Sequence, residues 1–200
     1  MIAAIFDLGG VLFTNGTKSF ISTFAKEHAL IEQDVKAVME GDLGTMYREN
    51  KITALEFWQR GLAQLRVGGE FKEYEKQWIN AYALIPGTKD VILKLRENGY
   101  QVYYLSDNVK ERVELLNARF SFLDLFDGGI FSHELGVRKP HPKVYEAMIN
   151  KYSLDPKQAV FIDDKQENLP PAESLGLNTI FFEDSNRLIS QLKEMGFNMQ

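Results

Sequence analysis

The sequence contains no cysteine. This absence excludes disulfide bonds, a thiolate nucleophile and a zinc site with cysteine ligands. The three histidines, His28, His133 and His141, are isolated and lack a metal-binding spacing such as H-E-x-x-H. We interpret them as ordinary surface or turn residues, so neither thiol chemistry nor a zinc site is expected.

An excess of positive charge is also absent. The 28 acidic residues outnumber the 23 Lys and Arg residues, which gives a formal net charge of −5. This charge would repel nucleic acid and anionic membranes unless a local basic patch overcame it, and the sequence contains no such patch. We therefore expect no nucleic-acid partner and no membrane partner.

Long hydrophobic runs are missing too. None approaches the ~20 residues that are needed to cross a bilayer. Only six residues, all of them apolar, precede Asp7, and no basic residue leads them, which is unlike a secretory signal. We expect a soluble, cytoplasmic protein, and no feature of the sequence specifies its oligomeric state.

The remaining composition is that of a folded globular chain. Of the 200 residues, 44% are hydrophobic and 26% are charged, close to globular averages. The length exceeds the common ~150-residue domain, which favours a main domain with a modest insert.

Five short apolar runs, rich in Val, Ile, Phe and Tyr, predict buried strands. Helical spacing in the segments between the later runs makes strand and helix alternate. This order predicts an α/β protein with a doubly wound, Rossmann-like parallel sheet. The expected strands are residues 3–6, 102–105, 129–131, 159–162 and 179–182.

The segment 15–84 breaks the alternation, because it contains four helical patterns in succession and no convincing strand. It predicts an inserted helical bundle, so that residues 1–14 and 85–200 form the α/β core domain and residues 15–84 a helical domain. The last pattern carries an aromatic stripe, which we interpret as bundle core rather than as a substrate-binding box. The stripe consists of Phe71, Tyr74, Trp78 and Tyr82.

Polar side chains follow four of the predicted strands. In chain order they are Asp7, Ser106, Lys139 and the pair Asp163-Asp164. Because the carboxyl ends of parallel strands lie along one edge of the sheet, we expect these groups to meet in one crevice. A carboxylate, a hydroxyl, an ammonium and an acid pair suit a phosphoryl group that is held against a metal ion.

Each of these groups would have a chemical role in phosphoryl transfer. The Asp7 carboxylate can attack phosphorus and form an aspartyl-phosphate, which divides a hard hydrolysis into two easier steps. Mg²⁺ prefers hard oxygen ligands, so Asp7 and an acid of the fourth strand can hold it beside the phosphate. Lys139 and the Ser106 hydroxyl would stabilise the other phosphoryl oxygens. Taken singly, each residue is also compatible with a cap or a surface position, and the favoured interpretation depends on their convergence.

In this order the motifs resemble those of the haloacid dehalogenase-like superfamily, and the resemblance spans nearly the whole chain. It implies a hydrolase of the phosphatase branch, in which the helical insert is a small cap that closes over the substrate. The members that it resembles are phosphatases of small sugar phosphates and related monoesters. The matching segments are Asp7-Leu8-Gly9-Gly10-Val11, Ser106, Lys139 in Val137-Arg138-Lys139-Pro140, and Asp163-Asp164 followed by Asn168.

The resemblance also implies roles for single residues. Asp7 would be the nucleophile and a Mg²⁺ ligand, together with the carbonyl of Gly9 and the carboxylate of Asp164. Asp163 would be a further ligand or a hydrogen-bonding neighbour, and the order within the pair stays open. Phosphate would be bound by Ser106, by the amides of Asp107 and Asn108, and by Lys139, which would bridge Asp7 and the phosphate.

Gly9 departs from the pattern of the family's phosphatases, which usually carry a general acid and base Asp at this position. Its loss typically costs ~10² to 10⁴ in rate. Leaving groups that need little protonation, such as the anomeric oxygen of a sugar 1-phosphate, should suffer least.

Two alternatives remain at this stage. One is a metal-independent dehalogenase that uses Asp7 on carbon, which the acid pair disfavours. The other is a weakened protein that binds a phosphorylated ligand or a protein partner, which the presence of Asp7 and Lys139 disfavours. The expected ligand is a small phosphorylated metabolite, and the sequence does not specify which one.

Overall fold

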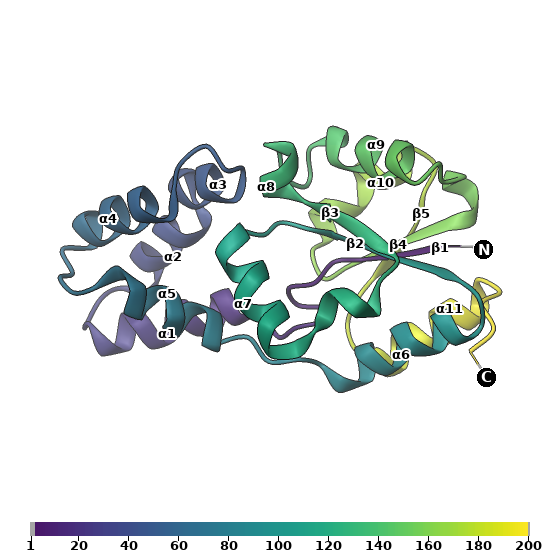
Figure 1. Cartoon of the computed structure of the whole chain (residues 1–200), viewed down its shortest axis with the longest axis horizontal. Helices are drawn as coiled ribbons and strands as arrows, with labels where there is room; N and C mark the ends of the chain where they lie inside the picture. Colours follow the sequence, from purple (N-terminus) through teal and green to yellow (C-terminus); the bar gives the residue numbers. More distant parts are fainter. Residues whose placement is uncertain (1–2, 200) are drawn as a thin grey trace.

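Figure 1 shows the computed structural model of the chain, which describes residues 3–199. A sheet with helices on both of its faces forms one part of the molecule, and a group of helices lies beyond the end of the sheet where the strands finish. The predicted α/β class is confirmed.

The sheet has five strands in the order β3-β2-β1-β4-β5, and every neighbouring pair is parallel. This order confirms the predicted doubly wound sheet, with β1 in the centre. The fifth strand ends at Phe181, one residue earlier than predicted. The strands are β1 (Ala3–Phe6), β2 (Gln101–Ser106), β3 (Gly128–Phe131), β4 (Ala159–Asp163) and β5 (Asn178–Phe181).

Helices cover the two faces because side chains alternate along each strand. In β1, Ala4 and Phe6 belong to one hydrophobic cluster, whereas Ala3 and Ile5 belong to the cluster of the opposite face. The first face is covered by α6 (Pro86–Glu97), α7 (Lys110–Phe120) and α11 (Ser185–Glu194), and the second by α9 (Pro142–Lys151) and α10 (Leu169–Ser174). The short helix α8 (Ser132–Leu135) follows β3, and 3-10 turns lie at Phe122–Leu125, Pro156–Gln158 and Gln166–Asn168.

The inserted segment forms five helices and no strand, where the sequence patterns predict four helices. The additional helix is α3, whose short length and Gly44-Thr45 pair hide its helical period. The division of the chain into two domains stays a prediction. The inserted helices are α1 (Gly16–Glu27), α2 (Glu32–Glu40), α3 (Asp42–Arg48), α4 (Ala54–Leu65) and α5 (Phe71–Asn80).

Aromatic side chains form the centre of the inserted helices, as the stripe in the sequence predicts. Trp78 is 1% exposed and packs edge to face against Trp58, with ring centroids 6.1 Å apart. Tyr82 differs from the rest of the stripe. It follows the end of α5, is buried, and lines the cavity described below.

The two ends of the inserted segment lie side by side. Phe13 forms an antiparallel bridge with Leu84, and the Thr14 amide donates to the carbonyl of Ala83 at 2.8 Å. The Ile85 amide donates to the carbonyl of Leu12, also at 2.8 Å. The chain therefore leaves the sheet and returns to it at one point, directly after β1.

Candidate active site

A cavity of about 240 Å³ lies at the carboxyl ends of the strands, between the sheet and the inserted helices. The structure brings the sequence-predicted residues together at this place. Asp163 and Asp164 do not line the cavity itself, but each has a carboxylate oxygen within 4.8 Å of one from Asp7 and of each other. The predicted residues that line it are Asp7, Gly9, Ser106, Asp107, Asn108 and Lys139.

Lys139 is the charged centre of the site. It is 3% exposed, and its Nζ lies 2.9 Å from Asp7 Oδ1 and 2.6 Å from Asp163 Oδ2. Burial alone would lower the pKa of Lys139, but the charges of Asp163 and Asp7 more than offset it, so the pKa is raised. The ammonium therefore stays charged and joins the two carboxylates. A bridge from Asp7 to phosphate stays a prediction.

Asp163 ends β4 and has both carboxylate oxygens occupied. Besides Lys139, Asn168 Nδ2 donates to its Oδ2 at 2.9 Å, and the Lys165 amide donates to its Oδ1 at 2.8 Å. Asp163 is completely buried, which requires such partners. The geometry thus favours Asp163 as the residue that holds Lys139 in place.

Asp164 differs from Asp163 in having a carboxylate oxygen without a hydrogen-bond partner among the described residues. Its Oδ1 is buried and has no hydrogen-bond partner within residues 3–199. Burial, and then the charges of Asp7 and Asp163, raises the pKa of Asp164 to about 7. An unpaired carboxylate oxygen beside a second carboxylate is a ligand set that suits a hard cation such as Mg²⁺. Asp7 and Asp164 therefore fit the predicted metal site.

The turn after β1 brings the backbone close to these acids. Gly10 has a φ of +91°, and a Cβ at this residue would lie 2.0 Å from Asp164 Oδ2. Only glycine satisfies both conditions. At Gly9, by contrast, a Cβ would have no neighbour within 4 Å, so space for a side chain is present where the family's acid is missing.

Hydrogen bonds to neighbouring residues fix the turn after β2. Asp107 accepts from the Lys139 amide at 3.0 Å and from Arg138 Nε at 3.1 Å. The Asn108 amide donates to Ser132 Oγ at 3.0 Å, so its predicted contact with phosphate would require Ser132 to release it. Ser106 is a buried residue that lines the cavity, and its hydroxyl makes no hydrogen bond to any residue that the structure describes.

The cavity residues that the sequence analysis does not place at the site include Arg48, Arg112 and Tyr82. Arg48 belongs to the unpredicted helix α3. Arg112 lies in α7, where a buried arginine interrupts an apolar face, which is the one signal that the sequence offers. Of the histidines, His133 contacts the site indirectly, since its Nδ1 lies 3.0 Å from the carbonyl of Asn108.

Within the described part of the chain, no helix is long and apolar enough to cross a membrane. The cluster of Asp7, Asp163 and Asp164 is also the one group of potential metal ligands found among residues 3–199.

Comparison with known proteins gives a consistent result. The family model described as haloacid dehalogenase-like hydrolase matches residues 1–176. D-ribitol-5-phosphate phosphatase from Bacteroides thetaiotaomicron is 28% identical over 186 residues, which cover 88% of each protein. Glyceraldehyde 3-phosphate phosphatase from Pyrococcus abyssi is 27% identical over 125 residues, 55% of this chain, and the match spans about half (52%) of that relative.

Solved structures agree with the observed fold. A haloacid dehalogenase family enzyme from Bacteroides thetaiotaomicron, in complex with magnesium and inorganic phosphate, has a TM-score of 0.77. It is 25% identical in sequence, and the alignment covers 94% of this chain and 98% of that one.

Proposed function

The chain belongs to the haloacid dehalogenase-like hydrolases, and from this premise we propose that it is a Mg²⁺-dependent phosphatase of small phosphomonoesters. The observation that carries the proposal is the arrangement around Asp7. Its carboxylate is 2.9 Å from the Lys139 ammonium, lies next to the unpaired Asp164, and borders a cavity. The names of the relatives, phosphatases of glyceraldehyde 3-phosphate and D-ribitol 5-phosphate, support a small phosphorylated metabolite as substrate.

Asp7 acts as the nucleophile in this proposal. One carboxylate oxygen forms a bond to phosphorus while the ester bond between phosphorus and the leaving oxygen breaks. Lys139 orients the attacking carboxylate, because its ammonium lies between Asp7 and Asp163. The Ser106 hydroxyl and the Asp107 amide bind oxygens of the transferred group.

The second half of the reaction regenerates Asp7. Water forms a bond to phosphorus of the aspartyl-phosphate as the bond between phosphorus and the Asp7 oxygen breaks, and the proton that the water loses goes to a phosphate oxygen or to solvent. Inorganic phosphate then departs, and the carboxylate returns to its pair with Lys139. A Mg²⁺ ion held by Asp7, Asp164 and the carbonyl of Gly9 would neutralise phosphoryl charge during both steps. Asp163 takes no direct part, since its oxygens are occupied.

The absence of a proton donor at Gly9 bears on the leaving group. Alkoxides of ordinary alcohols depart slowly without a proton, whereas departure of the anomeric oxygen of a sugar 1-phosphate depends less on protonation. We therefore expect faster release of phosphate from sugar 1-phosphates than from 6-phosphates of the same sugars. Equal rates would remove this argument.

A dehalogenase is the second candidate, because structures of dehalogenases share the fold at TM-scores of 0.66 and 0.67. Their identities of 18% and 19% support the fold alone. The buried, unpaired oxygen of Asp164 argues against metal-free chemistry, since no described residue satisfies it.

Hydrolysis of p-nitrophenyl phosphate, with and without Mg²⁺, tests the proposal. The wild type should release phosphate only with the metal, and Asp7→Asn should abolish release while the protein stays folded. Chloride release from a 2-haloacid that is insensitive to a chelator would favour the dehalogenase. A wild type no faster than Asp7→Asn on a broad phosphomonoester panel would favour a binding protein.

A further inference from the structure

Two buried arginines are left unused by the proposed chemistry. Arg48 and Arg112 are 6% and 4% exposed, and both line the cavity that contains Asp7. Arg48 ends α3 of the inserted helices, and Arg112 lies near the start of α7. Arginines are rarely buried without a carboxylate or phosphate partner, because an unpaired charge away from water is unfavourable.

Neither guanidinium forms an ion pair within residues 3–199. Arg112 is nevertheless fixed, because its Nε donates to Asn108 Oδ1 at 2.5 Å and its Nη1 donates to the Tyr82 hydroxyl at 2.6 Å. Its Nη2 donates to the carbonyl of Asp107 at 3.1 Å, and the group lies 4.6 Å from the centre of the Trp78 ring. Arg112 is thus a rigid positive charge beside the turn that follows β2.

Arg48 keeps unused donors. Its Nη1 donates to the carbonyls of Met39 and Gly44 at 2.7 and 3.0 Å, whereas Nε and Nη2 have no acceptor among the residues that the structure describes. Burial, and then the charges of Arg112 and Arg138, lowers the pKa of Arg48 to about 10, so the group stays charged at neutral pH. Two cations therefore repel each other across a cavity, and an anion between them would relieve this repulsion.

The acids of the cavity do not supply that anion. Each has a different cationic partner or lies in solvent, and none is within ion-pair distance of Arg48 or Arg112. Asp7 pairs with Lys139, Asp107 pairs with Arg138, Glu40 lies 3.9 Å from Lys36, and Glu167 is exposed.

We propose that Arg48, supported by the charge of Arg112, binds a second anionic group on the leaving-group side of the substrate, either a carboxylate or a further phosphate. The inference rests on the proposed function, in which Asp7 receives the transferred phosphoryl group in the same cavity. The planar fork of a guanidinium matches the oxygens of both anions. The preferred substrates are accordingly phosphomonoesters that carry a second negative charge.

Two matched substrate pairs test this preference and distinguish the two anions. Glyceraldehyde 3-phosphate and 3-phosphoglycerate differ by a carboxylate, and glucose 1-phosphate and glucose 1,6-bisphosphate differ by a phosphate. In the wild type, kcat/KM should be about 10- to 100-fold higher for the acidic member of one pair, as expected for a hydrogen-bonded charge pair. Equal or lower values for the acidic members of both pairs would overturn the inference.

Arg48→Gln then tests the residue, with Arg60→Gln as the matched control. Arg60 is exposed on α4 of the same insert. Arg48→Gln should reduce the ratio of kcat/KM between acidic and neutral substrates by about 10- to 100-fold, and Arg60→Gln should leave it unchanged. If Arg48 had only a structural role, the substitution would lower kcat/KM for acidic and neutral substrates alike. An unchanged ratio would therefore refute the assignment.

Product inhibition of the wild type covers the case in which Arg48→Gln fails to fold. Glycerate should inhibit hydrolysis competitively at concentrations where glycerol does not if the anion is a carboxylate, and equal inhibition constants together with no preference for the bisphosphate would overturn the inference. If p-nitrophenyl phosphate is hydrolysed without any preference for acidic substrates, only this inference fails. If no phosphomonoester releases phosphate, the proposed function fails with it.

Discussion

Gly9 and Gly10 are neighbours in the chain and meet different surroundings. A side chain at Gly10 would collide with the carboxylate of Asp164, whereas a side chain at Gly9 would find open space. Glycine is therefore sterically required at position 10, whereas at position 9 a side chain would fit and its absence affects only the chemistry. Substitutions at the two positions can separate these effects.

Gly9→Asp should restore a proton donor without disturbing the fold. We expect kcat/KM for an alkyl phosphate such as glycerol 3-phosphate to rise by about 10²-fold or more, since general acid catalysis contributes ~10² to 10⁴. The gain with p-nitrophenyl phosphate should be small, because that leaving group needs no proton. Gly9→Asn is the control of equal size, and an equal gain in this variant would show that proton transfer is not the cause.

Gly10→Ala should remove Mg²⁺-dependent activity, because its Cβ displaces Asp164. Gly196→Ala is a matched control, since Gly196 has a φ of +89° and no neighbour near its Cβ. Both variants should lose about 1–2 kcal/mol of unfolding free energy from the left-handed backbone. Chemical denaturation and Mg²⁺ titration of activity measure the two effects, and a fully active Gly10→Ala would contradict the proposed role of Asp164.

Lys139→Met should be strongly destabilising at neutral pH. Removing the ammonium leaves Asp7 and Asp163 buried without a counter-charge, which costs about 3–5 kcal/mol of unfolding free energy. Lys110→Met, at a lysine whose side chain is 72% exposed, should change it by less than about 0.5 kcal/mol.

The deficit of Lys139→Met should shrink as the pH falls. Burial already raises the pKa of Asp163 against the opposing charge of Lys139, so without the ammonium this pKa rises further and the folded state binds more protons than the unfolded state. Stability relative to the wild type then increases on acidification. Urea denaturation at pH 8 and pH 5 measures this trend, and a deficit that grows at pH 5 would show that the carboxylates do not depend on Lys139.

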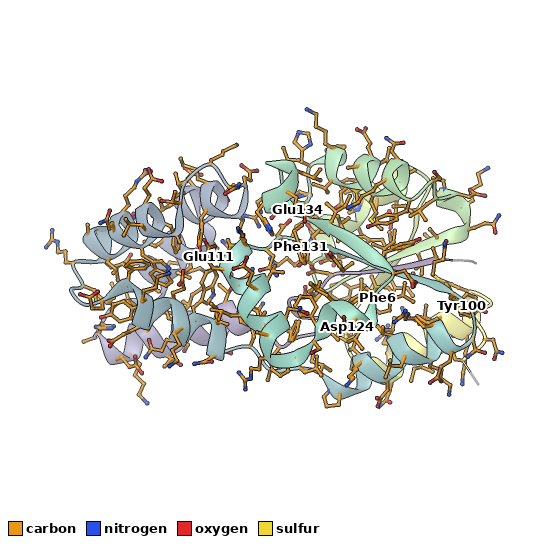
Figure 2. All side chains as sticks on the ribbon, in the orientation of Figure 1. Phe6, Tyr100, Glu111, Asp124, Phe131 and Glu134 are labelled. Carbon is orange, nitrogen blue, oxygen red and sulfur yellow. The ribbon has the colours of Figure 1, made fainter. Side chains whose placement is uncertain are left out.

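At the scale of elements, α3 connects the inserted helices to the sheet. The Tyr47 hydroxyl donates to Glu111 Oε2 of α7 at 3.0 Å, and Ser132 Oγ of α8 donates to the carbonyl of Arg48 at 2.7 Å. Figure 2 shows Glu111 where α7 faces the inserted helices. The shortest helix of the insert is therefore joined by direct hydrogen bonds to two elements outside the insert.

Tyr47→Phe should loosen this connection. The lost hydrogen bond contributes about 0.5–1.5 kcal/mol, and amide hydrogen exchange in α3 should accelerate accordingly while exchange in the sheet stays unchanged. Tyr74→Phe serves as the control, because the Tyr74 hydroxyl donates to the carbonyl of Gly68 within the insert. Equal acceleration of α3 in both variants would mean that the contact with Glu111 does not hold the helix.

The sequence predicts the strands and the convergence of Asp7, Ser106 and Lys139, because hydrophobic period and strand-end position are local properties. It does not predict which acid of the Asp163-Asp164 pair faces Lys139, since that depends on where β4 ends and the chain turns. Arg48 is missed for a related reason. Its helix is too short to show a period, and its place in the cavity arises from tertiary packing.

At the scale of the whole molecule, the acids near Asp7 should couple metal binding to stability. Mg²⁺ at 100 times its dissociation constant should add about 2.7 kcal/mol to the unfolding free energy and raise the melting temperature. Asp164→Asn should lose most of this increase, and without metal it should melt no lower than the wild type, because a buried negative charge is removed. An equal rise with NaCl at the same ionic strength would show a general salt effect.

The side-by-side ends of the inserted segment have a consequence for how such a protein can change. Thr14 and Ala83 are hydrogen-bonded to each other, so the chain enters and leaves the insert at one place. An insert of different length or sequence can be joined at the same two residues without altering the strand register. If the insert selects among substrates, as the proposed function implies, this selectivity would be exchangeable by recombination or by design while Asp7 and its neighbours stay the same.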